Sequence, residues 1–198
     1  MRLPENLTLI LASASPRRRE LLREAGYLFE VLPPEHVDET FLLGREAPEE
    51  YVQRLARAKC AEIAARFRGA DQGRLIVACD TIAECGGEVL GKPRDRADAR
   101  RMLQKLSGQQ HRVLSGICLW RLPEGRMETR LASSLLEMDP LSSSQLEEYL
   151  ASEQWIGKAG AFGYQDRTGW LRVIAGSESN VVGLPLDLFT ALLAEITT

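Results

Sequence analysis

Histidine and cysteine are scarce in this sequence, and their spacing excludes two common kinds of site. The 198 residues include two histidines and four cysteines, and no two cysteines form a CxxC pair. Disulfide-stabilised domains carry cysteine at higher density, and structural zinc sites need closely spaced cysteine or histidine ligands. We therefore expect buried, reduced thiols in a cytoplasmic protein, at Cys60, Cys79, Cys85 and Cys118.

Long apolar runs and a strong charge imbalance are also absent. No apolar run approaches the roughly 18 residues that a membrane span needs. The N-terminal region, in which three arginines at 17–19 follow a short apolar stretch, is atypical of a secretory signal. Lys and Arg number 25 against 28 Asp and Glu, whereas dedicated nucleic-acid binders are usually basic. We therefore expect neither a membrane nor a nucleic acid as partner.

Several familiar catalytic and nucleotide-binding motifs are missing. The sequence contains no Walker loop, no GxGxxG fingerprint, no GxSxG elbow and no HExxH metal motif. Hydrophobic residues make up 44% and charged residues 27%, which is typical of a globular protein with a substantial core. The candidate sites therefore come from less common patterns.

Strand and helix signals alternate along the chain. Short apolar runs predict strands at 7–12, 29–32, 75–83, 88–90, 112–121, 128–138 and 170–175. Amphipathic spacing and capping residues predict helices at 15–26, 48–67, 95–106, 142–151 and 185–196. In the helix at 48–67, Tyr51 and Leu55 are among the apolar positions. The alternation, with one long antiparallel pair, predicts a mixed α/β fold. The length fits a single domain over 1–198, or two small lobes flanking a cleft.

The first candidate site follows the first strand. Ser13 and other small residues there let the backbone approach a ligand, and the next helix begins at Ser15–Pro16 with free N–H groups. Guanidinium groups of Arg17 and Arg18 would add bidentate phosphate contacts. The alternative is a solvated basic turn.

The second candidate is Asp80, which we expect at the end of the apolar strand at 75–83. A carboxylate there is costly unless it is paired, bound to metal or exposed in a cleft, and strand ends commonly carry ligand sites in α/β proteins. A structural pair with a nearby arginine is the alternative. Lys92 follows in LGKP, and glycines at 157–163 and 176–183 shape a third candidate region.

Six segments, taken in order, resemble the Maf nucleotide pyrophosphatases. They are ASASPRRRELL, EYVQRLARAKC, ACDTI with GEVLGKP, LSGQQHRV, GKAGAFGYQ and GSESNVVGLPL. The resemblance extends from about residue 9 to residue 190, nearly the whole chain. Two departures are Cys79 in place of an alanine-like residue and Asp166–Thr168 in place of a more glycine-rich stretch.

The resemblance implies a fold and an activity. The fold is a mixed twisted sheet bent around a deep nucleotide-binding cleft, similar to inosine triphosphatase, in proteins that are often homodimers. The activity is hydrolysis of nucleoside triphosphates to the monophosphate and pyrophosphate with a divalent cation, Mg²⁺ or Mn²⁺. Thr81 and Gln165 are similar to the branch that acts on dTTP, UTP and modified pyrimidine triphosphates, whereas a sister branch acts on 7-methyl-GTP.

The resemblance also implies roles for single residues. Asp80 looks like the proton acceptor, and Glu39 looks like an acid that, with Asp80, helps to hold the metal. The remaining roles are as follows: Ser13, Arg17, Arg18, Lys59 and Lys92 bind the triphosphate, while Arg17, Thr81 and Gln165 discriminate the base. The rival hypotheses are a non-catalytic nucleotide-binding regulator of septum formation and a nucleic-acid-binding module.

Overall fold

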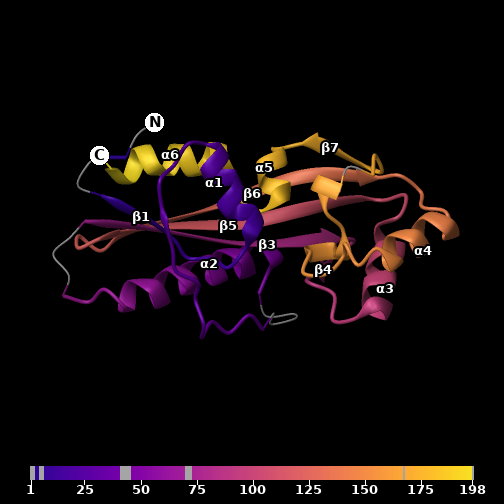
Figure 1. Ribbon diagram of the computed structural model, residues 1–198, viewed down its shortest axis with the longest axis horizontal. Helices are drawn as coiled ribbons and strands as arrows, with labels where there is room; N and C mark the ends of the chain where they lie inside the picture. Colours follow the sequence, from indigo (N-terminus) through magenta and orange to yellow (C-terminus); the bar gives the residue numbers. More distant parts are fainter. Residues whose placement is uncertain (1–2, 5–6, 41–45, 70–72, 167, 198) are drawn as a thin grey trace. The chain divides into compact units, whose positions relative to one another are not determined.

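The computed structural model describes residues 3–4, 7–40, 46–69, 73–166 and 168–197. Its strands are β1 (Thr8–Leu11), β2 (Glu30–Val31), β3 (Arg74–Cys85), β4 (Glu88–Leu90), β5 (Gln110–Leu122), β6 (Arg126–Met138) and β7 (Leu171–Ala175). The helices are α1 (Pro16–Glu24), α2 (Pro48–Ala65), α3 (Arg96–Leu106), α4 (Ser143–Ala151), α5 (Glu178–Val182) and α6 (Leu186–Thr197), with short 3₁₀ helices η1 (Ala159–Ala161) and η2 (Tyr164–Asp166). Figure 1 shows their order along the chain.

The strands form one seven-stranded mixed sheet in the order β2-β1-β3-β5-β6-β7, with β4 paired to β3. β1 runs parallel to both β2 and β3, whereas β4 is antiparallel to β3 and β7 is antiparallel to β6. The predicted mixed α/β fold is therefore confirmed. The chain divides into two compact units, of which unit 1 comprises 1–80, 115–132 and 183–198 and unit 2 comprises 81–114 and 133–182.

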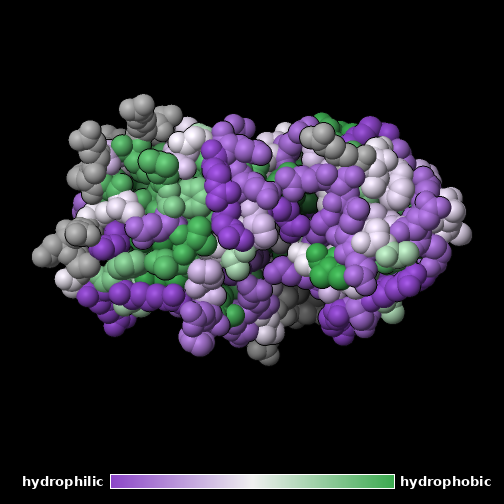
Figure 2. Space-filling view, in the orientation of Figure 1, coloured by the Kyte–Doolittle hydropathy of each residue, from purple (hydrophilic) through white to green (hydrophobic). Residues whose placement is uncertain are grey.

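The core of unit 1 lies between its strands and the helices that pack on them. Apolar side chains of α2 pack against β1, β3 and β5, and these include Ile10, Ala56, Cys60, Ile63, Ile76 and Cys118. In Figure 1, α6 lies on the side of the strands opposite α2, and the Phe189 ring of α6 meets the ring of Tyr27 edge-on at 5.1 Å. Figure 2 shows apolar side chains over β1 between these two helices. The two faces of the strands are thus both covered, as a buried parallel pair requires.

The core of unit 2 gathers side chains from β3, β4, β6, α3 and α4. Leu90, Leu103 and Leu106 are completely or almost completely buried there. Beside them, the rings of Tyr149, Phe162 and Trp170 pack together with centroids 5.0 to 5.9 Å apart. This aromatic cluster supports the glycine-rich segment between α4 and β7.

Local signals explain where several elements begin and end. The Ser15 hydroxyl accepts the Arg18 N–H at the start of α1, and Asp95 caps α3 in the same way. Gly86 and Gly87 both have positive φ, +59° and +82°, in the two-residue turn between β3 and β4. Only residues that tolerate the left-handed region form such a turn, and glycine does so without strain.

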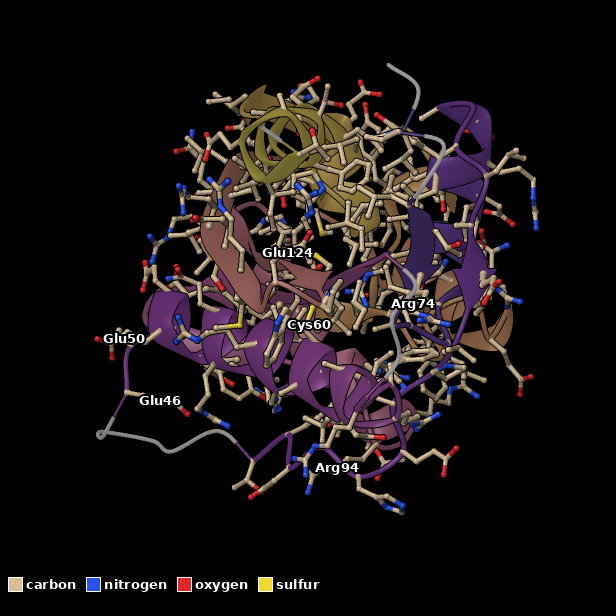
Figure 3. All side chains as sticks on the ribbon, turned by 90° about the vertical axis from the view of Figure 1, so that its left-hand side faces the viewer. Glu46, Glu50, Cys60, Arg74, Arg94 and Glu124 are labelled. Atoms are coloured by element: carbon tan, nitrogen blue, oxygen red, sulfur yellow. The ribbon has the colours of Figure 1, made fainter. Side chains whose placement is uncertain are left out.

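The four thiols are free and buried, as predicted. Cys60 Sγ donates to the Cys118 carbonyl at 3.3 Å, and Figure 3 shows Cys60 on the side of α2 that faces the strands. Burial raises the pKa of the Cys60 thiol well above its usual value, which makes it unreactive. Among the helices of the described ranges, none is both long enough and apolar enough to cross a membrane.

Candidate functional site

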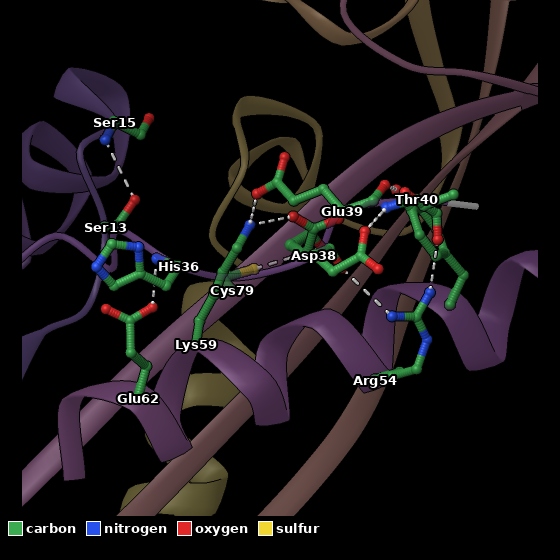
Figure 4. Close-up of polar contacts among 12 residues, drawn as sticks. Ser13, Ser15, His36, Asp38, Glu39, Thr40, Arg54, Lys59, Glu62 and Cys79 are labelled. Carbon is green, nitrogen blue, oxygen red and sulfur yellow. Dashed lines mark hydrogen bonds and ion pairs between the residues drawn. The ribbon is translucent and has the colours of Figure 1, made fainter. Parts of the chain in front are cut away.

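One ammonium group holds two carboxylates together in unit 1. Lys59 Nζ lies 2.6 Å from Asp80 Oδ1 and 2.7 Å from Glu39 Oε1 (Figure 4). The Lys59 and Asp80 side chains are 9% and 12% exposed, whereas the Glu39 side chain is 50% exposed. Three residues that the resemblance assigned to catalysis, metal and phosphate binding therefore lie in direct contact, with Glu39 open to solvent.

The position of Asp80 differs from the prediction. We expected it at the end of a strand, but β3 continues beyond it to Cys85. The register explains its location, because the parallel pairing of β1 with β3 ends at Leu11 and Val77. Asp80 therefore lies beyond the carboxyl end of β1, the edge at which open α/β sheets bind ligands.

The loop that carries Glu39 is fastened to α2 close to the Lys59–Asp80 contact. The Tyr51 hydroxyl donates to the Glu39 carbonyl at 2.6 Å. Burial, together with the negative charges of Asp80 and Glu39, raises the pKa of Tyr51 to about 12. The phenol therefore stays protonated and remains a hydrogen-bond donor across neutral pH.

Arg54 and Glu62 fasten the same loop on either side of Glu39. Arg54 donates to the carbonyls of Asp38 and Thr40 at 3.5 and 2.9 Å, and Glu46 binds the same guanidinium. The Glu62 carboxylate accepts the backbone N–H groups of Glu35 and His36. Tyr51, Arg54, Lys59 and Glu62 lie along one face of the helix, because residues three or four apart are neighbours there. One stripe of α2 therefore holds residues 35–40 in place. Figure 4 shows the Arg54 and Glu62 contacts.

A second group of predicted residues lies at the start of α1, also in unit 1. Ser13 Oγ accepts from the Ser15 N–H and from Arg18 Nη1, each at 3.2 Å. Arg18 Nε donates to the Gly183 carbonyl at 2.8 Å, which fixes the plane of the guanidinium. Arg17 is half-buried in the same turn, and no acidic residue stands there. A cationic helix start with oriented guanidinium groups favours an anionic ligand.

The remaining predicted residues belong to unit 2. Thr81 is half-buried on β3, directly after Asp80. Lys92 is exposed after β4, and Gln165 is exposed in the middle of η2. Their roles, and the predicted cleft with its two lobes, stay predictions.

The Glu39 and Asp80 carboxylates have the chemistry of divalent-cation ligands. Carboxylate oxygens are the ligands that Mg²⁺ and Mn²⁺ prefer, and Mg²⁺ commonly takes one or two of them together with water and substrate phosphates. Within the described ranges, no group of three or more His, Cys, Asp or Glu side chains is placed to hold a metal alone. Glu39 and Asp80 therefore fit a cation that completes its coordination with a phosphate ligand.

Two residues of this site were not identified as functional from the sequence. Tyr51 was read as an apolar position of α2, and Arg54 was not singled out. Both lie on the same face of the helix as Lys59. Counting back from Lys59 in helical steps of three or four residues is the signal that could have identified them.

The family profile and similar named relatives indicate the same family for this chain. The sequence profile described as Maf-like protein matches residues 8–196. A protein of Rhodopirellula baltica named dTTP/UTP pyrophosphatase is 47% identical over 191 residues, which cover 96% of this chain and 82% of the relative. A protein of the same name from Paramagnetospirillum magneticum is 44% identical over 90% of this chain and 91% of its own length.

A solved structure shares the fold. The Staphylococcus aureus Ham1 protein superposes with a TM-score of 0.51 over 95% of this chain and 98% of its own. Its sequence identity is 13%, so the likeness concerns the fold alone.

Proposed function

The chain belongs to the Maf-like protein family, and from this premise we propose that it hydrolyses dTTP, UTP and modified pyrimidine triphosphates to the monophosphate and pyrophosphate. Relatives named dTTP/UTP pyrophosphatase are 41 to 47% identical to this chain over most of its length. The observation that carries the proposal is the contact of Lys59 with both Asp80 and Glu39. A buried ammonium between two carboxylates, at the edge where α/β sheets bind ligands, is suited to a phosphate reaction.

In the proposed mechanism, Asp80 is the proton acceptor. Water attacks the α-phosphorus, its proton passes to the Asp80 carboxylate, and the bond from the α-phosphorus to the bridging oxygen of pyrophosphate breaks. The Lys59 ammonium fixes the orientation of that carboxylate through its 2.6 Å contact. Positioned proton transfer of this kind contributes about 10²–10⁴-fold to a rate.

The Ser13 hydroxyl and four positive side chains bind the triphosphate, and the positive side chains offset its charge. Ser13, Arg17 and Arg18 bind phosphate oxygens at the start of α1, and Lys59 and Lys92 add two ammonium groups. A Mg²⁺ or Mn²⁺ ion held by Glu39 and Asp80 would supply further charge neutralisation for the pyrophosphate leaving group. The orientation of Arg18 by Ser13 and Gly183 supports its assignment.

The metal assignment has a test that does not use activity. Lys59→Met leaves the Glu39 and Asp80 carboxylates without their shared ammonium, so we expect a lower melting temperature. Added Mn²⁺ should raise the melting temperature more in this variant than in the wild type, because a cation replaces the lost charge. An equal response of both proteins to Mn²⁺ would contradict the assignment.

Base choice is assigned to Gln165, with Thr81 and Arg17. The glutamine amide both donates and accepts, so it matches the O4 and N3–H edge of uracil and thymine. Once a bound base covers these groups, leaving one of them unpaired costs about 1–3 kcal/mol. UTP and dTTP should therefore exceed GTP and 7-methyl-GTP at least about tenfold in kcat/KM, the factor given by about 1.4 kcal/mol.

A panel of canonical and modified triphosphates, with detection of pyrophosphate and a Gln165→Glu variant, tests this function. Preferred use of 7-methyl-GTP would assign the chain to the sister activity. Tight nucleotide binding without turnover would favour a regulator of septum formation. An unchanged substrate profile in the variant would remove Gln165 from the base site.

Location and assembly are proposals of the same kind. Four free, buried thiols suit a reducing cytoplasm, and the net charge of -3 argues against nucleic acid as a partner. The homodimer rests on the family resemblance, and light scattering of the purified chain tests it directly.

A further inference from the structure

Asp166 directly follows Gln165 and is the last residue of η2. Its carboxylate has three donors within unit 2. Oδ1 pairs with the Lys158 ammonium, while Oδ2 accepts from the Tyr149 hydroxyl at 2.5 Å and from the Gly163 N–H at 3.2 Å. The side chain is only 9% exposed, so these contacts replace the water that a surface carboxylate would have.

Two of the donors belong to one segment, and the third belongs to a neighbouring helix. Lys158 and Gly163 belong to the glycine-rich segment 157–166, and Tyr149 belongs to α4. A Cβ at position 163 would lie 2.7 Å from Lys158 Nζ and 2.9 Å from its Cδ. Glycine at 163 therefore lets the segment close over its own lysine, and Asp166 ties the closed segment to α4.

Gln165 has a second anchored neighbour. The Tyr164 hydroxyl donates to Glu178 Oε1 at 2.7 Å, which links η2 to α5. The exposed Gln165 side chain thus projects from a backbone that is held on both sides. Near the start of the segment, the Gly160 N–H donates to the Gly91 carbonyl.

We infer that Asp166 is a positioning residue that sets base specificity through Gln165. Its contact with Lys158 closes the segment 157–166, and its contact with Tyr149 ties that segment to α4. Together they hold the Gln165 amide where a pyrimidine edge can meet it. The inference rests on the proposed function, in which Gln165 contacts the base. A hydrogen-bonding group discriminates well only when it is held in position before the ligand arrives.

Asp166→Asn tests the inference, because it keeps the shape of the side chain and removes the charge that pairs with Lys158. We expect KM for UTP to rise about tenfold and the ratio of kcat/KM for UTP over GTP to fall by a similar factor. The kcat for UTP should stay within about twofold, since Asp80, Glu39 and Lys59 are unchanged. Asp166→Glu, which keeps the charge, should restore part of the ratio.

The matched control is Asp98→Asn in the same unit. The Asp98 side chain is 6% exposed and is paired with Arg94 and Arg101, so this variant also removes a buried, ion-paired charge. It should leave the UTP-to-GTP ratio unchanged. Tyr149→Phe removes a single hydrogen bond to Asp166, and it should lower the ratio in the same direction even where Asp166→Asn folds poorly.

Hydrogen exchange of the nucleotide-free protein measures the anchor itself. Exchange of amides in 157–166 should accelerate in Asp166→Asn and not in Asp98→Asn. Faster exchange with an unchanged UTP-to-GTP ratio would make Asp166 purely structural and overturn the inference. Failure of the proposed function is distinguishable, because a wild-type enzyme that releases no pyrophosphate, or that does not prefer UTP to GTP, reveals it before any variant is measured.

Discussion

Among single residues, Asp80 and Lys59 make the closest contact between opposite charges in the proposed site. Both side chains are nearly buried, and removing one partner of such a pair leaves an uncompensated charge that typically costs several kcal/mol. Substitutions that keep shape are therefore more informative here than truncation to alanine.

Asp80→Asn removes the carboxylate and keeps the size of the side chain. We expect turnover of UTP to fall about 10²–10⁴-fold, because the amide cannot take the proton from water. Nucleotide binding, measured by calorimetry, should largely survive because the arginine and lysine contacts remain. Arg17→Ala and Lys92→Ala should instead weaken binding and turnover together.

The control for Asp80→Asn lies on the same strand. Glu84 is buried on β3, where it binds Arg112 and the Gly87 N–H. Glu84→Gln should leave turnover within a few-fold of the wild type. Near-normal turnover in Asp80→Asn would show that Asp80 is structural and that another group accepts the proton.

At the scale of elements, α2 does more than cover the sheet. Its buried face packs against β1, β3 and β5, and its polar stripe of Tyr51, Arg54, Lys59 and Glu62 holds the loop 35–40. One helix therefore fixes both the framework of unit 1 and the position of Glu39.

Arg54→Met should disturb Glu39 without touching its carboxylate. Loss of the contacts to the Asp38 and Thr40 carbonyls loosens the loop, and we expect the dissociation constant for Mn²⁺ to rise by about tenfold, as for other residues that orient metal ligands. Paramagnetic resonance of Mn²⁺ titrations measures this without turnover.

The comparison variant for Arg54→Met is Arg100→Met on α3, whose guanidinium binds Glu147. It should leave Mn²⁺ binding unchanged. If both variants bind Mn²⁺ as the wild type does, the contacts of Arg54 do not position Glu39 for the metal.

The sequence predicted the larger elements because their signals are local. Ser15, Asp95 and Ser142 cap helices where expected, and Gly86–Gly87 make the turn between the strands predicted at 75–83 and 88–90. The short helices η1, η2 and α5 were missed, because three to five residues give no periodic signal. Asp80 was expected at a strand end, but β3 continues to Cys85, and pairing with Lys59 stabilises the carboxylate within the strand.

The site was predictable only in part. The apolar strand around it made Asp80 a candidate, and resemblance supplied Glu39 and Lys59. The contact among the three depends on a loop, a helix and a strand that are distant in sequence. The roles of Tyr51 and Arg54 depend on that same tertiary contact, since helical spacing alone does not say which loop lies against the stripe. Asp166 was noted from the sequence, but the groups that donate hydrogen bonds to it could not be predicted.

At the scale of the whole molecule, stability should depend on pH through His111. This residue of unit 2 is 5% exposed. Burial lowers the pKa of its imidazole, against the opposing effects of the Gln109 backbone and Glu84. As pH falls through about 6.5, the unfolded chain takes up a proton that the folded protein resists. The free energy of unfolding should therefore decrease below about pH 6.5, by at most about 1.4 kcal/mol per pH unit from this group.

Denaturant unfolding between about pH 7.5 and 5 checks this contribution. His111→Gln should flatten the decline, whereas His36→Gln should not, because the His36 side chain is 85% exposed. Equal slopes in the wild type and His111→Gln would show that His111 does not contribute to the acid sensitivity of the fold.

The most direct test of the proposed mechanism is to measure which phosphorus atom of UTP the water attacks. Attack at the α-phosphorus, with Asp80 as proton acceptor, predicts that hydrolysis of UTP in ¹⁸O-labelled water gives UMP carrying one labelled oxygen and unlabelled pyrophosphate. Mass spectrometry of the products of the wild-type enzyme, with Asp80→Asn as the slow comparison, reads this out. Label in the pyrophosphate, or release of UDP and phosphate, would contradict it.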